Sequence, residues 1–195
     1  MSDSIASNYP KSVTLPDGET VEIRLMSADD RDAILSFAQA LPQEDLLFLR
    51  LDITQPEVID DWVSNIATGH TTSLIVYADD KVIGYASVHR NPAPWTRRVG
   101  ELRVNVDQEY RARSLGKNLT SEIFEVARGL GLRKLMANMT SDQRGAQAAF
   151  RRLGFVAEAL LTDYVEDRNG SSRDLVIMTY EIDGHSDKIA SVVKI

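Results

Sequence analysis

Hydrophobic and polar residues alternate along much of the chain with the two-residue period of a β-strand. This pattern predicts strands within the ranges 21–25, 73–78, 81–88, 99–106, 134–139, 155–165 and 174–182. Asp79-Asp80 and Asn169-Gly170 lie between consecutive predicted strands and indicate hairpin turns. The chain is therefore expected to build a sheet with several antiparallel neighbours.

Four other stretches repeat their apolar residues with the period of an α-helix. The first follows Ser27 and stops before Pro42, and the second begins at Thr54; the remaining two cover 115–130 and 146–153. Trp62 and Phe124 lie on the apolar stripes of their helices, so both are expected in the core. Strands and helices mixed in this order predict an α/β protein.

Composition excludes several classes of protein. The 195 residues carry a formal charge of -7, which argues against nucleic acid as the main partner, because such proteins usually show a basic excess. The absence of cysteine removes disulfides, thiolate nucleophiles and sulfur-ligated zinc. The three histidines are too scattered for a helical metal motif, so we expect no metal.

The ends of the chain are expected to lie outside the folded unit. The amino terminus lacks the basic start and apolar stretch of a signal peptide, and no apolar run is long enough to span a membrane. We therefore expect a cytoplasmic protein without a membrane partner. The expected organisation is a flexible leader over 1–12, a single domain over 13–183 and a tail over 184–195.

The segment Val104–Lys117 is the most informative for function. A predicted strand ends there, a turn with Arg111, Arg113 and Lys117 follows, and a helix begins near Leu115. Free amides and the dipole at a helix amino terminus favour an anion, so a pyrophosphate suits this position. A helix capped by Ser114 beside a solvated basic turn explains the same residues without a ligand.

Three segments resemble the GNAT superfamily of N-acyltransferases. Arg111-Ala-Arg-Ser-Leu-Gly116 is similar to its pyrophosphate-binding signature, and Ala149-Phe-Arg-Arg-Leu-Gly-Phe155 to its late helix-to-strand signature. The opening segment, 15–24, is similar to the catalytic domain of bacterial protein-lysine acetyltransferases. The resemblance implies a mixed, mostly antiparallel sheet of about six to seven strands flanked by about four helices.

The resemblance also implies a set of site residues. Glu101 matches an acidic residue that serves as general base in many relatives, although a solvent-facing strand glutamate is the alternative. The positions matched to acetyl-CoA binding are Val104, Val106, Arg111, Ala112, Arg113, Ser114, Leu115, Gly116, Lys117, Gln143 and Phe150. Three of these depart from the family pattern: Ser114 replaces a glycine, Phe150 a tyrosine that acts as general acid, and Gln143 an asparagine.

The implied reaction is direct transfer of an acetyl group from acetyl-CoA to a primary amine. A protein lysine is the favoured acceptor; a polyamine or aminoglycoside, a non-catalytic acyl-CoA-binding module and a plain interaction domain remain alternatives. A homodimer is left open. His89 is expected at an exposed loop edge, with a place lining the amine cleft near Glu101 as the alternative. Trp95, between two prolines and two arginines, either contacts a substrate or caps its loop.

Overall fold

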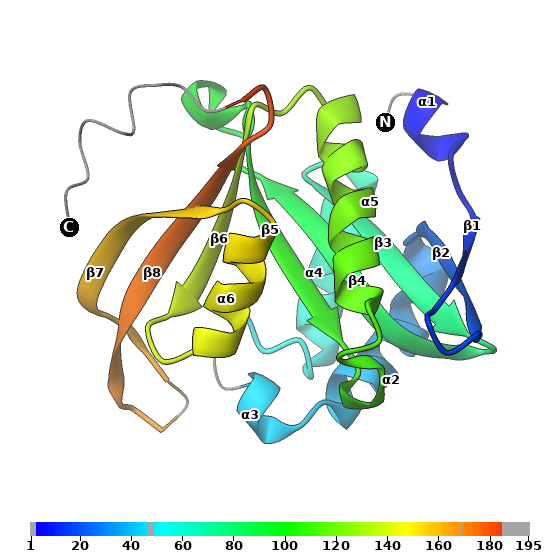
Figure 1. Ribbon diagram of the computed structural model, residues 1–195, viewed down its shortest axis with the longest axis horizontal. Coiled ribbons are helices and arrows are strands. Elements are labelled where there is room, and N and C mark those ends of the chain that lie inside the picture. The colour runs from blue at the N-terminus through cyan, green and yellow to red at the C-terminus, as the bar shows by residue number, and fades with distance from the viewer. Residues whose placement is uncertain (1–2, 47–48, 168, 185–195) are drawn as a thin grey trace.

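The computed structural model describes residues 3–46, 49–167 and 169–184. Their strands form one sheet in the order β1-β2-β3-β4-β5-β6-β8-β7 (Figure 1). The strands are β1 Lys11–Thr14, β2 Thr20–Leu25, β3 Thr71–Ala78, β4 Lys81–Arg90, β5 Val99–Val106, β6 Lys134–Thr140, β7 Val156–Glu166 and β8 Ser172–Glu181. The helices are α1 Asp3–Ala6, α2 Arg31–Ala40, α3 Gln43–Leu46, α4 Pro56–Ala67, α5 Leu115–Gly129 and α6 Arg144–Arg152, with 3-10 turns η1 Ala28–Asp30, η2 Pro94–Thr96 and η3 Gln108–Tyr110.

Neighbouring strands run antiparallel throughout this sheet except for β5 and β6, which run parallel. The parallel pair needs a crossover connection, and α5 provides it. The predicted α/β class and mostly antiparallel sheet are confirmed. The sheet has eight strands in the described residues, against the six to seven expected.

The additional strand, β1, begins within the range 1–12 that was expected to be a flexible leader. Asp3–Ala6 form α1, and β1 pairs with β2 from Lys11 onward. Ile5 is 3% exposed and packs on α5, where a Cβ added to Gly129 would lie 2.8 Å from Ile5 Cγ1. The described part of the segment has one buried side chain, Ile5, and a strand of four residues. This is too short for a hydrophobic periodicity that would predict it from sequence. The expected tail lies outside the described residues from position 185.

Helices cover both faces of the sheet (Figure 1). Five residues of α5, among them Leu119 and Ile123, pack in one apolar cluster with strands β2 to β6, and α6 adds Phe150 to it. On the opposite face, α2 and α4 pack against β3 and β4 around Ile75 and Tyr85. Trp62 is 7% exposed and lies in this second cluster, as expected from its helical stripe. The central strands are therefore buried on both faces.

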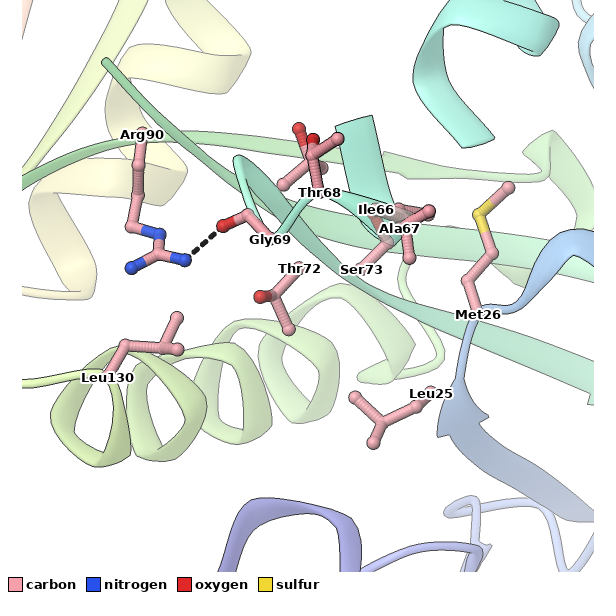
Figure 2. A pocket seen from close by; sticks show the side chains of 11 residues that line it. Leu25, Met26, Ile66, Ala67, Thr68, Gly69, Thr72, Ser73, Arg90 and Leu130 are labelled. Carbon is pink, nitrogen blue, oxygen red and sulfur yellow. Dashed lines mark hydrogen bonds between the residues drawn. The ribbon is translucent and has the colours of Figure 1, made fainter. Parts of the chain in front are cut away.

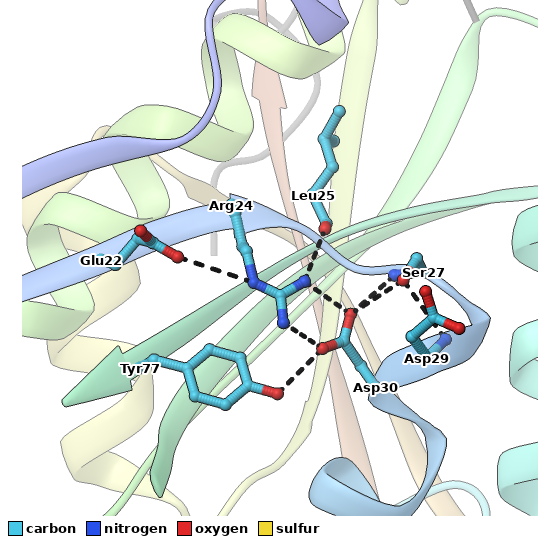
Figure 3. Close-up of polar contacts among 7 residues, drawn as sticks. All are labelled: Glu22, Arg24, Leu25, Ser27, Asp29, Asp30 and Tyr77. Atoms are coloured by element: carbon cyan, nitrogen blue, oxygen red, sulfur yellow. Dashed lines mark hydrogen bonds and ion pairs between the residues drawn. The ribbon is translucent and has the colours of Figure 1, made fainter. Parts of the chain in front are cut away.

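A buried carboxylate joins the start of α2 to the sheet (Figure 3). Asp30 is 1% exposed; it accepts hydrogen bonds from the Arg24 guanidinium, the Tyr77 hydroxyl at 2.8 Å and the Ser27 amide at 2.8 Å. Burial alone would raise the pKa of Asp30, but the hydrogen bonds from Arg24, Ser27 and Tyr77 hold that pKa below its usual range. This cluster fixes the direction in which the chain leaves β2.

Among the described residues, no helix is both long and apolar enough to cross a membrane.

Candidate active site

Strands β5 and β6 diverge. They pair only from Val99 to Glu101 on β5, opposite Lys134 to Met136 on β6, although both strands continue well beyond these residues (Figure 1). On its other side β5 stays paired with β4 as far as Val106. The β6-facing edge of β5 therefore has backbone N–H and C=O groups from Leu102 onward without a strand partner, and these groups require another hydrogen-bonding partner.

The turn after β5 presents further backbone amides. Ala112 and Ser114 both have left-handed backbones, with φ of 63° and 66°. The first intrahelical hydrogen bond of α5 runs from the Asn118 amide to the Ser114 carbonyl at 3.0 Å, so the amides of Leu115, Gly116 and Lys117 come before it. Ser114 makes no side-chain cap. The solvated-cap explanation of this helix start is therefore weakened, and its amides can receive an anion.

The first turn of α5 packs onto the end of β5. Leu115 is fully buried, so only its backbone can face a ligand. A Cβ added to Gly116 would lie 3.7 Å from Val106 Cγ2, an ordinary contact distance. The amide-rich turn and the open edge of β5, where Val104 is half-buried, are thus continuous.

Two of the three basic side chains on this turn are paired with acids from distant segments. Arg113 contacts Asp17 and Glu19 and stacks on the Tyr110 ring, 4.5 Å from its centroid. Arg111 pairs with Asp45 and donates to the Val106 carbonyl at 3.2 Å. Lys117 is exposed and makes no ion pair within the described part of the chain. The unbalanced positive charge expected on this turn is therefore reduced largely to Lys117.

Helix α6 begins just beyond the end of β6 and carries Gln143 at its amino-terminal cap position. Gln143 Oε1 accepts from the Thr140 amide at 3.0 Å. Gln147, which sequence reasoning missed, is 7% exposed and donates to the carbonyls of Thr140 and Ser141 at 3.0 and 3.1 Å. Phe150 is half-buried and meets Phe155 edge to face, with ring centroids 4.9 Å apart. Its ring packs in the core and has no proton to donate.

Glu101 lies on β5 at the last residue pair before the strands diverge, and two arginines hold its carboxylate. Arg103 Nε and Nη2 donate to Oε1 at 3.0 and 2.9 Å, and Arg50 Nη1 donates to Oε2 at 2.9 Å. The Glu101 side chain is 14% exposed, whereas that of Arg50 is 69% exposed. Glu101 is thus a largely buried, paired carboxylate, which removes the alternative of a solvent-facing strand residue.

His89 lies opposite Glu101 in the β4–β5 register. It is half-buried within β4, so the expectation of an exposed loop edge is wrong. Its Nδ1 and Nε2 are within 3.1 Å of Thr71 Oγ1 and 2.8 Å of Ser87 Oγ. Burial, reinforced by Arg103 and Arg50, lowers the pKa of His89 to about 3, so the ring is neutral at pH 7.

A small cavity of about 100 Å³ adjoins these residues. Its walls include Leu51, Trp62, Tyr85, His89 and Arg103. The cavity thus lies on the α4 face of the sheet and connects the apolar second cluster to the polar group around Glu101. A small ligand that has both an apolar arm and a polar group suits this combination.

A second cavity, of about 210 Å³, lies at the end of α4 (Figure 2). It shares only Thr71 with the His89 cavity. In it the Arg90 guanidinium donates to the Gly69 carbonyl just beyond the helix, where a cation complements the helix dipole. Arg90 therefore stabilises the carboxyl end of α4.

Sequence reasoning missed Arg103 and Arg50. Arg103 follows Glu101 by two residues and so shares its face of β5, a signal that was available. Arg50 lies 51 positions from Glu101 and belongs to no predicted element, so nothing local could pair them.

Comparison with known proteins agrees with this architecture. The model of the acetyltransferase (GNAT) family matches residues 35–155, more than half of the chain. A Bacillus subtilis protein named "putative phosphinothricin acetyltransferase YwnH" is 25% identical over 167 residues, covering 82% of this chain and 98% of its own.

Two solved structures share the fold. The GNAT domain of S. lividans PAT superposes with a TM-score of 0.75 at 17% identity, covering 90% of this chain and 98% of its own. The yncA structure from Salmonella typhimurium, solved with its cofactor acetyl-CoA, has a TM-score of 0.73 at 22% identity and covers 85% and 96%. With the matched family model, these likenesses confirm the expected superfamily: the chain belongs to the GNAT family of acetyltransferases and is an acyltransferase.

Proposed function

We propose that this acyltransferase uses acetyl-CoA and binds its diphosphate at the turn from Arg111 to Lys117. The observation that carries the proposal is the continuity of this amide-rich turn with the open edge of β5. Three amides that precede the first hydrogen bond of α5 suit a diphosphate, and Lys117, which has no ion pair with any described residue, adds a positive charge. Ala112, Arg113 and Ser114 would contribute mainly through their backbone.

The open edge of β5 fits the remainder of the cofactor. Peptide-like amides can pair with a strand edge as another strand would, so the backbones of Val104 and Val106 are the proposed partners. A backbone N–H there would also stabilise negative charge on the acyl oxygen. Gln143, the cap residue of α6, and Phe150, on α6, are the proposed cofactor contacts on the β6 side of the opening between β5 and β6.

Glu101 is the proposed general base. The acceptor ammonium must lose a proton to Glu101 before its nitrogen attacks the acyl carbonyl. The C–N bond then forms and the C–S bond breaks, the nitrogen releases its second proton to solvent, and the thiolate takes up a proton. Both Glu101 oxygens already accept hydrogen bonds in the structure, so the acceptor competes with these partners for the carboxylate. Arg50 is the easier one to displace, since its side chain is 69% exposed and it makes one hydrogen bond to Glu101, whereas Arg103 makes two.

Phe150 cannot protonate the departing thiolate, so another group must donate this proton. The ring has no ionisable proton, and solvent is the proposed source. Positioning of the two substrates supplies much of the acceleration in such transfers, so activity does not require a tyrosine there.

A protein lysine remains the proposed acceptor, on the similarity of residues 15–24 to bacterial protein-lysine acetyltransferases. The name of the Bacillus subtilis relative supports a small amine instead. A small amine needs only the His89 cavity, whereas a protein needs an additional docking surface.

The decisive experiment measures acetyl-CoA binding and thiol release separately. Acetyl-CoA at a hundredfold excess over its dissociation constant should stabilise the fold by about 2.7 kcal/mol. Thiol release is then measured with lysine peptides, polyamines and aminoglycosides. Binding without thiol release from any acceptor would favour the non-catalytic module, and no binding of any acyl-CoA would refute the proposal.

Two variants separate binding from chemistry. Glu101→Gln should lower turnover and leave acetyl-CoA affinity largely unchanged, because the residue faces the acceptor. Lys117→Ala should weaken acetyl-CoA binding. Arg113→Ala tests the sequence prediction that the Arg113 side chain contacts the diphosphate: unchanged affinity would show that this assignment is wrong.

A further inference from the structure

Trp95 is 89% exposed, the highest exposure among the large exposed hydrophobic residues of the described chain. It lies in η2, between β4 and β5, where Pro94 opens the turn and restricts its backbone. The turn is further held by the Ala93 amide, which donates to Asn91 Oδ1 at 2.8 Å, and by the Arg97 guanidinium, which donates to the Pro94 carbonyl at 2.8 Å. The indole is thus presented to solvent on an ordered turn.

Three exposed arginines accompany Trp95. Arg97 and Arg98 follow it in sequence, and Arg133 is brought beside them because its amide donates to the Arg98 carbonyl at 2.8 Å. Arg98 also donates to the Gly131 carbonyl at 3.2 Å. Arg98 pairs with Asp183 at 3.6 Å, and both of these side chains are more than half exposed. In a chain of net charge -7, this group is locally positive.

We refer to Trp95, Arg97, Arg98 and Arg133 as the Trp95 surface. Tryptophan and arginine are the residue types most enriched at the energetic centres of protein interfaces. The positive charge specifies an acidic partner rather than a second copy of the same patch.

The Trp95 surface also lies close to the proposed transfer site. Glu101 follows Arg98 by three residues along β5, a separation of about 10 Å at the rise of a strand. An extended peptide spans the same length in about three residues. A chain with its lysine at Glu101 can therefore place residues three to five positions away on the Trp95 surface.

We propose that the Trp95 surface docks an acidic segment of a protein acceptor, three to five residues from the lysine that is acetylated. This proposal rests on the proposed function and names a feature of its substrate. Carboxylates of the segment pair with the arginines while an aliphatic part of the segment packs on the indole. A polyamine or aminoglycoside would be repelled by the same surface.

The test compares two peptides that contain a single lysine. One carries glutamates three to five positions from the lysine on both sides, and the other carries glutamines at those positions. Three exposed charge pairs should give the glutamate peptide about a tenfold higher kcat/KM at low salt. This preference should fall strongly in about 1 M salt, where charges are screened within about 3 Å.

Two variants locate the effect. The double variant Arg97→Gln with Arg133→Gln should reduce the preference to about twofold, because one exposed charge pair remains. Trp95→Ala should lower kcat/KM for both peptides, because the indole packs on an aliphatic part that the two peptides share. Tyr164→Ala is the matched control, because Tyr164 is also an exposed aromatic residue, at 64%, but lies on β7. It should keep the full preference. Equal kcat/KM for both peptides in the wild type, or a preference unchanged in the double arginine variant, would overturn the proposal.

Fluorescence gives a readout that does not depend on acetyl transfer. The chain has two tryptophans, and Trp62 is buried, so a blue shift on adding the glutamate peptide reports Trp95. Trp95→Phe should abolish the shift. A fluorescence shift without acetylation of any acceptor would support the docking surface and refute the proposed function. Acetylation with neither a fluorescence shift nor a preference for the glutamate peptide would support the proposed function and refute the docking surface.

Discussion

Arg50 and Glu101 are joined by a hydrogen bond of 2.9 Å although 51 residues separate them in sequence. Arg50 precedes α4 and Glu101 lies on β5, so the contact connects the helical layer to the strand at which the sheet opens. The exposed arginine and the largely buried carboxylate form an asymmetric pair. In the proposed reaction, the arginine leaves and the acceptor ammonium replaces it.

The first prediction concerns this exchange. Arg50→Ala should lower the KM for a lysine acceptor several-fold, because no internal cation then competes for Glu101 Oε2. Arg50→Lys keeps the charge and should behave as the wild type. Steady-state kinetics at saturating acetyl-CoA provide the measurement. An increase in KM in Arg50→Ala would instead assign Arg50 to binding the acceptor.

The second prediction concerns the left-handed backbone of Ser114. A side chain at φ 66° costs about 1–2 kcal/mol, whereas glycine adopts this conformation freely but loses more entropy on folding. Ser114→Gly should therefore stay within about 1 kcal/mol of the wild type in stability. Ser114→Val should lose at least about 1–2 kcal/mol, because a branched Cβ is strained there.

Chemical denaturation measures both Ser114 variants, and acetyl-CoA titration shows whether the turn keeps its shape. Ser114→Gly should retain affinity, since the amides of the turn keep their positions. Equal stability in the glycine and valine variants would show that Ser114 does not hold the left-handed conformation in solution.

Sequence periodicity predicted best those elements with one polar and one apolar face. Val99–Val106 has its predicted bounds, and the helix that begins at Leu115 starts where the apolar stripe does. β1 was missed because its four residues offer a single apolar position, Val13. Its place in the sheet depends on pairing with β2, which is a tertiary property.

The site was predictable where it consists of backbone and less so where it depends on charge. The strand, turn and helix from Val104 to Lys117 follow from local pattern. The pairing of Arg113 with Asp17 and Glu19 does not, because the β1–β2 hairpin approaches α5 only in the folded chain. Local sequence shows an uncompensated basic turn, and the fold supplies the missing acids.

The third prediction uses His89. Its pKa is lowered from 6.5 to about 3 in the folded protein, chiefly by burial. The unfolded chain therefore binds more protons below pH 6.5, and stability falls as the pH falls towards 3. Between pH 7 and pH 5 this one group should remove about 2 kcal/mol from the free energy of unfolding.

Denaturation at both pH values in the wild type and in His89→Gln isolates this contribution. Glutamine keeps a hydrogen-bonding side chain between Thr71 and Ser87 but has no proton to gain. The variant should lose about 2 kcal/mol less than the wild type over the same interval. An identical loss in the two proteins would mean that His89 is protonated in the folded state.

The fourth prediction concerns Asp30, whose carboxylate is 1% exposed and bonded to Arg24, Ser27 and Tyr77. Removing one partner of a buried ion pair leaves the other charge poorly solvated, so Asp30→Ala should cost about 3 kcal/mol. Glu22→Ala is the matched control: Glu22 also faces Arg24, at 3.7 Å, but its side chain is 49% exposed. It should cost less than about 1 kcal/mol. Urea denaturation at pH 7 compares the two variants.

Asp30 fixes the entry to α2 and makes none of the proposed substrate contacts. The folded Asp30→Ala protein should therefore bind acetyl-CoA with the affinity of the wild type. A loss of acetyl-CoA affinity under conditions in which the variant is fully folded would show instead that the β2–α2 junction is coupled to the turn from Arg111 to Lys117.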